Sequence, residues 1–296
     1  MSRILVGVDG SEDSRRAVRW ASAAADALGV DLRAIQAWQY PATAILSSSD
    51  ILDPRRAAAR IEAELRELLE EILGADAERV EVEAGRGPAA VALLHAAGEG
   101  AEMVVVGSRG LGGFKGLLLG SVGRQLCEHA PCAVTVVRRS AKVEPVRLDT
   151  IVVGTDGSPD ATRALRFAGD LATRMEADLV VAHAASPGDD YRLVTEQVLA
   201  HPDDRSNEPK VDLEARHDMV ENWCAPLRDD GVDHRIAVVS GDARNALLDA
   251  AHDNSADLLV VGSRGHGPVK KMLLGSVAAA LIQHSEMPVT VVPQGR

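Results

Sequence analysis

The chain has 296 residues, enough for about two domains, and 46% of them are hydrophobic although only 2% are aromatic. A core of this composition is built from Ala, Val, Leu and Ile, as in parallel α/β proteins. The formal charge of −12 argues against a nucleic-acid-binding surface, which needs clustered lysine and arginine.

The sequence carries no marks of export or membrane insertion. No apolar stretch reaches the length of a membrane span, and an apolar strand pattern follows Met1 almost directly, with no signal peptide. The three cysteines, Cys127, Cys132 and Cys224, form neither a disulfide framework nor a Cys-x-x-Cys pair, and no residues have the spacing of a zinc site. We therefore expect a reduced, cytoplasmic protein with no site for a metal held by protein ligands alone.

The first half of the chain alternates short apolar runs with amphipathic stretches. Ser11 suits the N-cap of the first helix and Gly29 suits its end. Strands separated by helices of this length predict a parallel, doubly wound sheet with right-handed crossovers. The expected strands cover residues 3–8, 31–38, 79–84, 103–106 and 133–137, and the expected helices cover 12–28, 54–73, 88–97 and 121–129.

The second half repeats this programme. Asp9 corresponds to Asp156 with an offset of 147, whereas Gly107 corresponds to Gly262 with an offset of 155, so the second half contains eight extra residues. We assign them to a loop over residues 186–210, which is rich in Pro, Asp, Asn and Ser. Strands are expected over residues 151–155, 178–183, 234–239, 258–261 and 289–292, and helices from residue 159, over 211–223 and over 276–284. The charged stretch 138–149 reads as a linker between domains 1–140 and 148–296.

A glycine motif occurs once in each half. After a V-V-V-G or L-V-V-G strand, two glycines with the spacing G-x-x-G are followed, after nine intervening residues, by Gly-Ser-Val at the start of a helix. Glycine backbone can come close to a ligand, and the N–H groups at a helix N-terminus attract phosphate. The alternative is a loop that needs glycine only for its turns, but the repeat favours a phosphate site. The motif residues are Gly107, Gly110, Gly120, Ser121 and Val122 in the first half and Gly262, Gly265, Gly275, Ser276 and Val277 in the second.

The motif, with V-G-V-D-G-S at the start of the unit and H-A-P-C-x-V-T-V-V at its end, resembles the universal stress protein family in its tandem form. The resemblance covers nearly the whole chain. It implies two tandem, doubly wound (Rossmann-like) α/β domains, each with a five-stranded parallel sheet of order 3-2-1-4-5 flanked by helices.

Asp9 and Asp156 are further candidates for the binding site. If the family's strand order applies, Asp9 and Gly107 face one crevice at the topological switch point. A carboxylate there repels phosphate, so we expect it to accept hydrogen bonds from the sugar or base. The alternative makes these aspartates helix caps, although Ser11 and Ser158 already occupy the capping positions.

Four cations lie in or near the two glycine motifs. Arg109 and Arg264 lie between the motif glycines and either reach phosphate or point into water. Lys115 and Lys270 do not have the spacing of a Walker lysine. No nucleophile and base pair is evident, so we expect weak ATPase activity at most.

The resemblance implies a stress-response protein that binds ATP or a related adenine nucleotide, one per domain, with Mg²⁺ neutralising the phosphates. We expect a nucleotide-dependent regulator or sensor. The alternatives are a slow ATPase or nucleotidyl-transferring enzyme, and a partner-binding scaffold with a structural nucleotide. One departure is Pro268, which stands where the first motif has Gly113 and removes one N–H donor.

The two fifth strands, residues 133–137 and 289–292, are apolar and lie at sheet edges in this strand order. Exposed edges of this kind invite aggregation. Pairing them matches how universal stress proteins resemble dimers joined through this strand. We expect an intramolecular pseudo-dimer with its axis between Thr135 and Thr290, which can pair again into a homodimer.

Overall fold

The structure is a computed structural model that describes residues 2–39, 53–111, 119–138, 148–185, 213–266 and 274–294. The chain forms two compact units. The first contains residues Met1–Arg147 together with Ile282–Arg296, and the second contains Leu148–Leu281. Each unit alternates strands with helices, as the sequence predicts.

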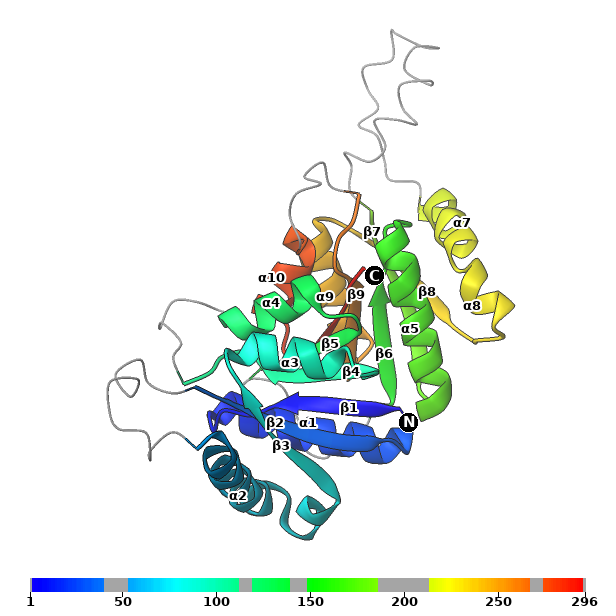
Figure 1. Ribbon diagram of the computed structural model, residues 1–296. Coiled ribbons are helices and arrows are strands. Elements are labelled where there is room, and N and C mark those ends of the chain that lie inside the picture. The colour runs from blue at the N-terminus through cyan, green and yellow to red at the C-terminus, as the bar shows by residue number, and fades with distance from the viewer. Residues whose placement is uncertain are drawn as a thin grey trace, which may run out of the picture. The chain divides into compact units, whose positions relative to one another are not determined.

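The first unit is built on a parallel sheet in the order β3-β2-β1-β4-β5, which confirms the predicted strand order (Figure 1). Helices α1 and α2 contact each other and the sheet, as do α3 and α4, and Figure 1 shows the two pairs on opposite faces. The elements are β1 (Arg3–Gly7), α1 (Glu12–Leu28), β2 (Asp31–Trp38), α2 (Pro54–Leu73), the 3-10 helix η3 (Gly74–Arg79), β3 (Val80–Arg86), α3 (Ala89–Ala97), β4 (Met103–Gly107), α4 (Ser121–His129) and β5 (Ala133–Val137).

Helix α1 shows why these elements form where the sequence places them. The Ser11 hydroxyl accepts a hydrogen bond from the Ser14 N–H at 3.2 Å, so Ser11 is the N-cap, as predicted. Gly29 ends the helix with φ of 64°, a left-handed conformation that glycine adopts without strain. The small buried face, with Ala17 and Ala21 fully buried, brings the helix close to the sheet.

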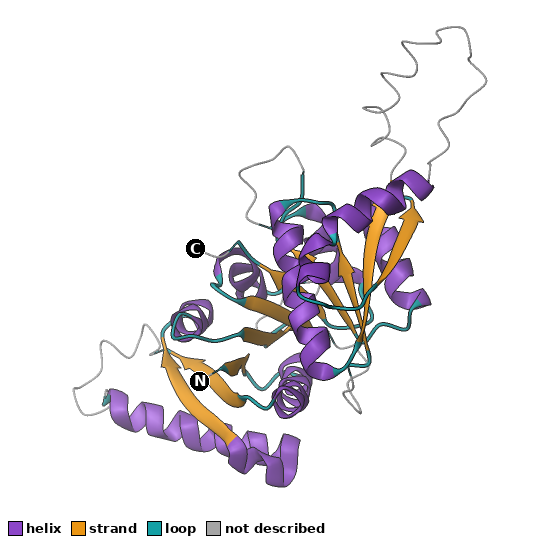
Figure 2. Ribbon diagram, turned by 90° about the vertical axis from the view of Figure 1, so that its right-hand side faces the viewer, coloured by secondary structure: helices purple, strands orange, loops and turns teal. Residues whose placement is uncertain are grey.

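The second unit repeats the first four strands of this design. Its sheet is parallel in the order β8-β7-β6-β9, and Figure 2 shows helices on both sides of its strands. The sequence analysis did not predict α8 and α9, nor η3 in the first unit. The elements are β6 (Thr150–Gly154), α5 (Pro159–Met175), β7 (Asp178–Ala185), α7 (Leu213–Trp223), α8 (Ala225–Asp229), β8 (Arg235–Ser240), α9 (Ala243–Asp253), β9 (Leu258–Gly262) and α10 (Ser276–His284).

The last strand, β10 (Val289–Val292), belongs to the first unit. It pairs with β5 in antiparallel fashion, with Thr290 opposite Thr135. The two threonine hydroxyls are fully buried and lie 2.8 Å apart, within hydrogen-bonding distance. Each of the two apolar strands therefore has a partner along this edge.

Several predictions fall on residues outside the described ranges: the inserted loop 186–210, most of the linker 138–149, Gly113, Lys115, Pro268 and Lys270. Across the described helices, none is long and apolar enough to cross a membrane.

Candidate functional site

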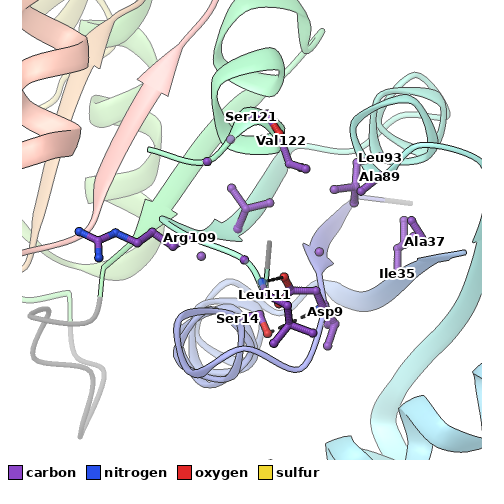
Figure 3. A pocket seen from close by; sticks show the side chains of 17 residues that line it. Asp9, Ser14, Ile35, Ala37, Ala89, Leu93, Arg109, Leu111, Ser121 and Val122 are labelled. Atoms are coloured by element: carbon purple, nitrogen blue, oxygen red, sulfur yellow. Dashed lines mark hydrogen bonds between the residues drawn. The ribbon is translucent and has the colours of Figure 1, made fainter. Parts of the chain in front are cut away.

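A cavity of about 490 Å³ lies in the first unit at the carboxyl ends of β1 and β4 (Figure 3). The two strands are direct neighbours, so this is the switch point at which doubly wound sheets bind ligands. The volume is typical of a small-molecule site. The cavity is lined by Gly7, Val8, Asp9, Ser14, Ile35, Ala37, Ala89, Leu93, Val106, Gly107, Arg109, Gly110, Leu111, Gly120, Ser121, Val122 and Gly123.

One end of the cavity is apolar. Ile35 and Ala37 of β2 face Ala89 and Leu93 of α3 across it (Figure 3). Two walls of small aliphatic side chains suit a flat, apolar group such as a nucleobase. The sequence analysis did not name these residues, because their shared position depends on how α3 packs against β2.

The other end of the cavity is the start of α4. Gly120 is its N-cap, with extended φ and ψ of −67° and 157°, and no side chain caps the helix there. The Gly120 N–H donates to the Ser108 carbonyl at 2.8 Å, which joins the start of the helix to the residue directly after β4. The N–H groups in the first turn of a helix, here those of Ser121 and Val122, have no partner within the helix, and such groups attract an anion.

Two glycines of the first motif, Gly107 and Gly110, are required by close packing rather than by a left-handed turn. None of Gly107, Gly110 and Gly120 has a positive φ. A Cβ on Gly107 lies 2.6 Å from the carbonyl carbon of Asp13, and one on Gly110 lies 2.3 Å from Asp9 Oδ2. The glycine loop therefore lies directly against the start of α1.

Asp9 joins two parts of the loop structure. Its Oδ1 accepts a hydrogen bond from the Ser11 N–H at 3.0 Å. Its Oδ2 accepts one from the Leu111 N–H, also at 3.0 Å (Figure 3). The carboxylate is solvent-exposed and borders the cavity. It fixes the turn after β1 to the loop after β4 and keeps lone pairs available to a ligand.

A buried pair beneath the loop was missed by the sequence analysis. The Ser108 hydroxyl donates to Asp13 Oδ2 at 2.7 Å, and the two residues are 3% and 7% exposed. The second unit repeats the pair, with Ser263 donating to Asp160 at 2.9 Å. The available signal was the recurrence of an acidic residue in the first helical turn and of serine after the motif's first glycine.

The second unit brings its predicted site residues together in the same way. Asp156 Oδ1 accepts from the Ser158 N–H and Oδ2 accepts from the His266 N–H, both at 3.0 Å. The Gly275 N–H donates to the Ser263 carbonyl at 2.7 Å, as Gly120 does to Ser108. Gly262 and Gly265 again lie against Asp160 and Asp156, and Gly275 is followed by Ser276 and Val277 at the start of α10.

The two motif arginines differ. Arg109 is exposed and borders the cavity, and Figure 3 shows its guanidinium pointing away from the apolar end. Arg264 is only half-exposed, and its Nε lies 3.6 Å from Asp160 Oδ2. The second arginine is therefore held by a carboxylate of its own unit.

An aromatic side chain also distinguishes the second unit. Trp223 packs on Gly157, leaving no space for a Cβ there, whereas a Cβ on Gly10, the equivalent residue, meets nothing within 4 Å. The Trp223 ring contacts His183 edge to face, with 5.2 Å between ring centres. The turn after the first strand is thus covered in the second unit and open in the first, within the described residues.

Metal ligands are not gathered in the described ranges, where no group of three His, Cys, Asp or Glu residues could hold a metal ion. The polar groups at the cavity are backbone N–H groups, hydroxyls, one carboxylate and one guanidinium. This set can bind an anionic ligand, and it contains no cysteine or histidine.

The model of the universal stress protein family matches residues 1–138 and 147–293. A universal stress protein of Mycobacterium tuberculosis is 31% identical over 310 residues, which cover 98% of this chain and 97% of that protein. A second one from the same species is 32% identical over 319 residues, covering 98% and 95%.

A solved structure that matches nearly the whole chain agrees on the fold. A universal stress protein from Archaeoglobus fulgidus superposes with a TM-score of 0.66 at 22% identity, covering 99% of this chain and 98% of its own. A shorter universal stress protein solved in complex with cAMP is 30% identical over 50% of this chain and 98% of its own, with a TM-score of 0.34. With both halves matched by the family model, the chain belongs to the universal stress protein family as a tandem member.

Proposed function

We propose that the protein binds ATP, one molecule in each family domain, and acts as a nucleotide-dependent regulator or sensor in the stress response. The observation that carries this proposal is the start of α4, which has no side-chain cap and faces a cavity whose opposite end is apolar. Phosphate suits the first feature and adenine suits the second. Asp9, between the two ends, is suited to accept a hydrogen bond from the ribose.

In this proposal Mg²⁺ accompanies ATP and is held mainly by the phosphates and water, since the cavity offers a single carboxylate. Because the cavity has so few titratable groups, we expect ATP hydrolysis to be slow or absent. A regulator of this kind acts in the cytoplasm, where ATP is present.

Isothermal titration of the full chain with ATP and Mg²⁺ tests the proposal, and two bound nucleotides per chain are expected. Gly120→Val places a branched side chain at the helix start and is expected to remove the first site, and Gly275→Val the second. Gly120→Ala is the folding control, because its Cβ has an ordinary contact of 3.5 Å with the Ser108 carbonyl oxygen. cAMP serves as a competing ligand. Absence of heat, together with absence of nucleotide in protein purified without added ligand, would refute the proposal.

The expected turnover is below about 1 per second, the lower end for kinases, because no residue is placed to activate water or stabilise a transferred phosphate. Phosphate release measured with excess ATP checks this. If the unaltered chain turns over ATP faster than this rate, and if Gly120→Val or Gly275→Val abolishes that activity, the protein is an enzyme and the proposal of a regulator is wrong.

We further propose that the two family domains, residues 1–140 and 148–296, form a pseudo-dimer through their fifth strands, and that chains associate again into a homodimer. The antiparallel ladder between β5 and β10 supports the first part. Replacing Val136 and Val291 by proline removes donors from this ladder and is expected to lower solubility. Sedimentation velocity tests the homodimer, and a chain that stays monomeric at high concentration contradicts it.

A further inference from the structure

Two arginines lie at neighbouring strand ends beside the first glycine loop. Strands β4 and β5 are parallel, with Gly107 opposite Val137, and the Ser108 N–H donates to the Val137 carbonyl at 2.9 Å. Arg138 directly follows Val137, and Arg109 directly follows Ser108. The two arginines therefore lie at neighbouring strand ends, offset by one residue, at the carboxyl edge of the sheet.

The two positive charges act on each other. Burial and, after it, the neighbouring Arg109 lower the pKa of Arg138, while the Asp13 carboxylate acts in the opposite direction. Arg138 Nη1 donates to the Ser285 carbonyl at 3.2 Å, a neutral acceptor. In the part of the chain that the structure describes, no carboxylate pairs with Arg109. Two adjacent cations in this situation are stabilised by an anion placed between them.

The second glycine motif has no such pair. Arg264, the equivalent of Arg109, lies 3.6 Å from Asp160. The position that corresponds to Arg138, after the strand with Thr290 in place of Thr135, is Pro293. One cation is thus already neutralised and the other is absent.

We propose that Arg109 and Arg138 bind the terminal phosphates of a nucleoside triphosphate, so that the first site prefers a triphosphate to the corresponding monophosphate and the second site does not. The inference rests on the nucleotide binding proposed above. The backbone N–H groups at the start of α4 serve the phosphate nearest the nucleoside equally well in both ligands. Only a longer phosphate chain can extend along the loop to the guanidinium groups, whose planar donors match phosphate oxygens.

The test compares the affinities for ATP and AMP at each site, both with Mg²⁺. In the full chain carrying Gly275→Val, titration reports the first site, and in the chain carrying Gly120→Val it reports the second. We expect the first site to bind ATP about tenfold or more tightly than AMP, as a charge-assisted contact implies, and the second to show a ratio within about threefold. Adding Arg138→Gln or Arg109→Gln to the first-site chain is expected to weaken ATP about tenfold and AMP less than about twofold.

Arg138→Lys, which keeps the charge, is expected to retain most of the preference. Arg60→Gln is the matched control, because it removes an equal charge from an exposed position on α2, where Arg60 pairs with Glu64. If Arg138→Gln perturbs folding, Arg109→Gln still decides, since its side chain is exposed. Equal loss of ATP and AMP affinity, or an unchanged ratio, would overturn the inference and leave nucleotide binding intact. Failure of the unaltered chain to bind either nucleotide would instead overturn the proposed function.

Discussion

The two glycine motifs of the chain have the same backbone and different electrostatics. In the first unit the carboxylate of Glu12 lies 3.5 Å from Arg16. Asp13 accepts a hydrogen bond from Ser108 and interacts electrostatically with Arg138. In the second unit the residue equivalent to Glu12 is Pro159, which offers no charge. Arg163 and Arg264 both form ion pairs with Asp160.

This difference teaches that the motif spacing sets the shape of the site but not its charge. The spacing fixes which backbone segments touch, because the contacts of Gly107 and Gly262 with the first helix are nearly identical. The charge depends on the first residue of that helix. Where it is Glu12, the following arginine, Arg16, pairs with it, and where it is Pro159, Arg163 pairs with Asp160 instead. Two copies of one motif in a single chain can therefore bind ligands of different charge.

The largest expected effect concerns thiol reactivity, which compares the two units directly. Burial and then Glu128 raise the pKa of Cys127 in the first unit from 9.0 to about 12, and burial and then Glu221 raise that of Cys224 in the second to about 11. At pH 8 the thiolate fraction of Cys127 is about a thousandfold below that of a free thiol. We expect slow alkylation of the folded protein, with Cys224 labelled before Cys127 as the pH rises.

Peptide-level mass spectrometry after iodoacetamide treatment at several pH values measures this order, with urea-unfolded protein as the control. The same shifts predict the sign of the pH dependence of stability. The folded pKa values lie above the unfolded ones, so the stabilisation is complete below pH 9 and is lost as the pH rises through about 11 to 12. Rapid labelling of Cys127 at pH 8 contradicts the prediction.

The next effect tests whether the first glycine of each motif is structural. Gly107→Ala brings a Cβ to 2.6 Å from the Asp13 backbone, which cannot move without shifting α1. We expect a loss of about 3 kcal/mol of unfolding free energy, at the upper end for overpacking, and a similar loss for Gly262→Ala. Urea unfolding followed by circular dichroism measures both.

Gly120→Ala is the matched control, with an expected loss of about 1 kcal/mol or less, because alanine is a poorer N-cap than glycine but its Cβ fits. Equal losses at Gly107 and Gly120 would show that the close contact with α1 does not decide the cost.

How much of this the sequence could predict depends on the range of the interaction. Helix α1 and strand β5 begin and end as predicted, because a capping serine, a terminal glycine and an apolar run are local signals. The contact of Trp223 with Gly157 joins residues 66 positions apart, and the Ser108 bond to Asp13 spans 95. Neither has a local signature, and the only hint of the second in the sequence was that the acidic residue and the serine recur in both halves.

The fates of the two motif arginines were likewise beyond local reasoning. Arg109 and Arg264 occupy the same motif position, and both a phosphate contact and exposure to water were open for each. The two arginines differ in the charged residue that lies near each of them. Arg264 lies near the carboxylate of Asp160, whereas Arg109 lies near the guanidinium of Arg138.

A smaller effect sharpens the comparison of these arginines. Arg264→Gln removes one of the two cations beside Asp160, whose side chain is 9% exposed. We expect a loss of about 1.5 kcal/mol, below the cost of breaking a buried pair outright because Arg163 and Ser263 remain. Arg109→Gln is expected to leave stability unchanged, since no carboxylate in the described part of the chain depends on it. Equal changes in melting temperature for the two variants would show that the contact with Asp160 carries no weight.

The smallest expected effect concerns the buried threonine pair between β5 and β10. Thr135→Val leaves the Thr290 hydroxyl buried without its partner, with an expected loss of about 1 kcal/mol. Thr290→Val costs less, because the Thr135 hydroxyl can still donate to the Met103 sulfur at 3.2 Å. The double variant replaces both hydroxyls by methyl groups of similar shape and is expected to be close to neutral, so the two single losses do not add. A double-mutant cycle from urea unfolding measures the coupling. Additive losses would mean that the two hydroxyls do not bond in solution, and the two strands would then be held together by their backbone ladder and valine packing alone.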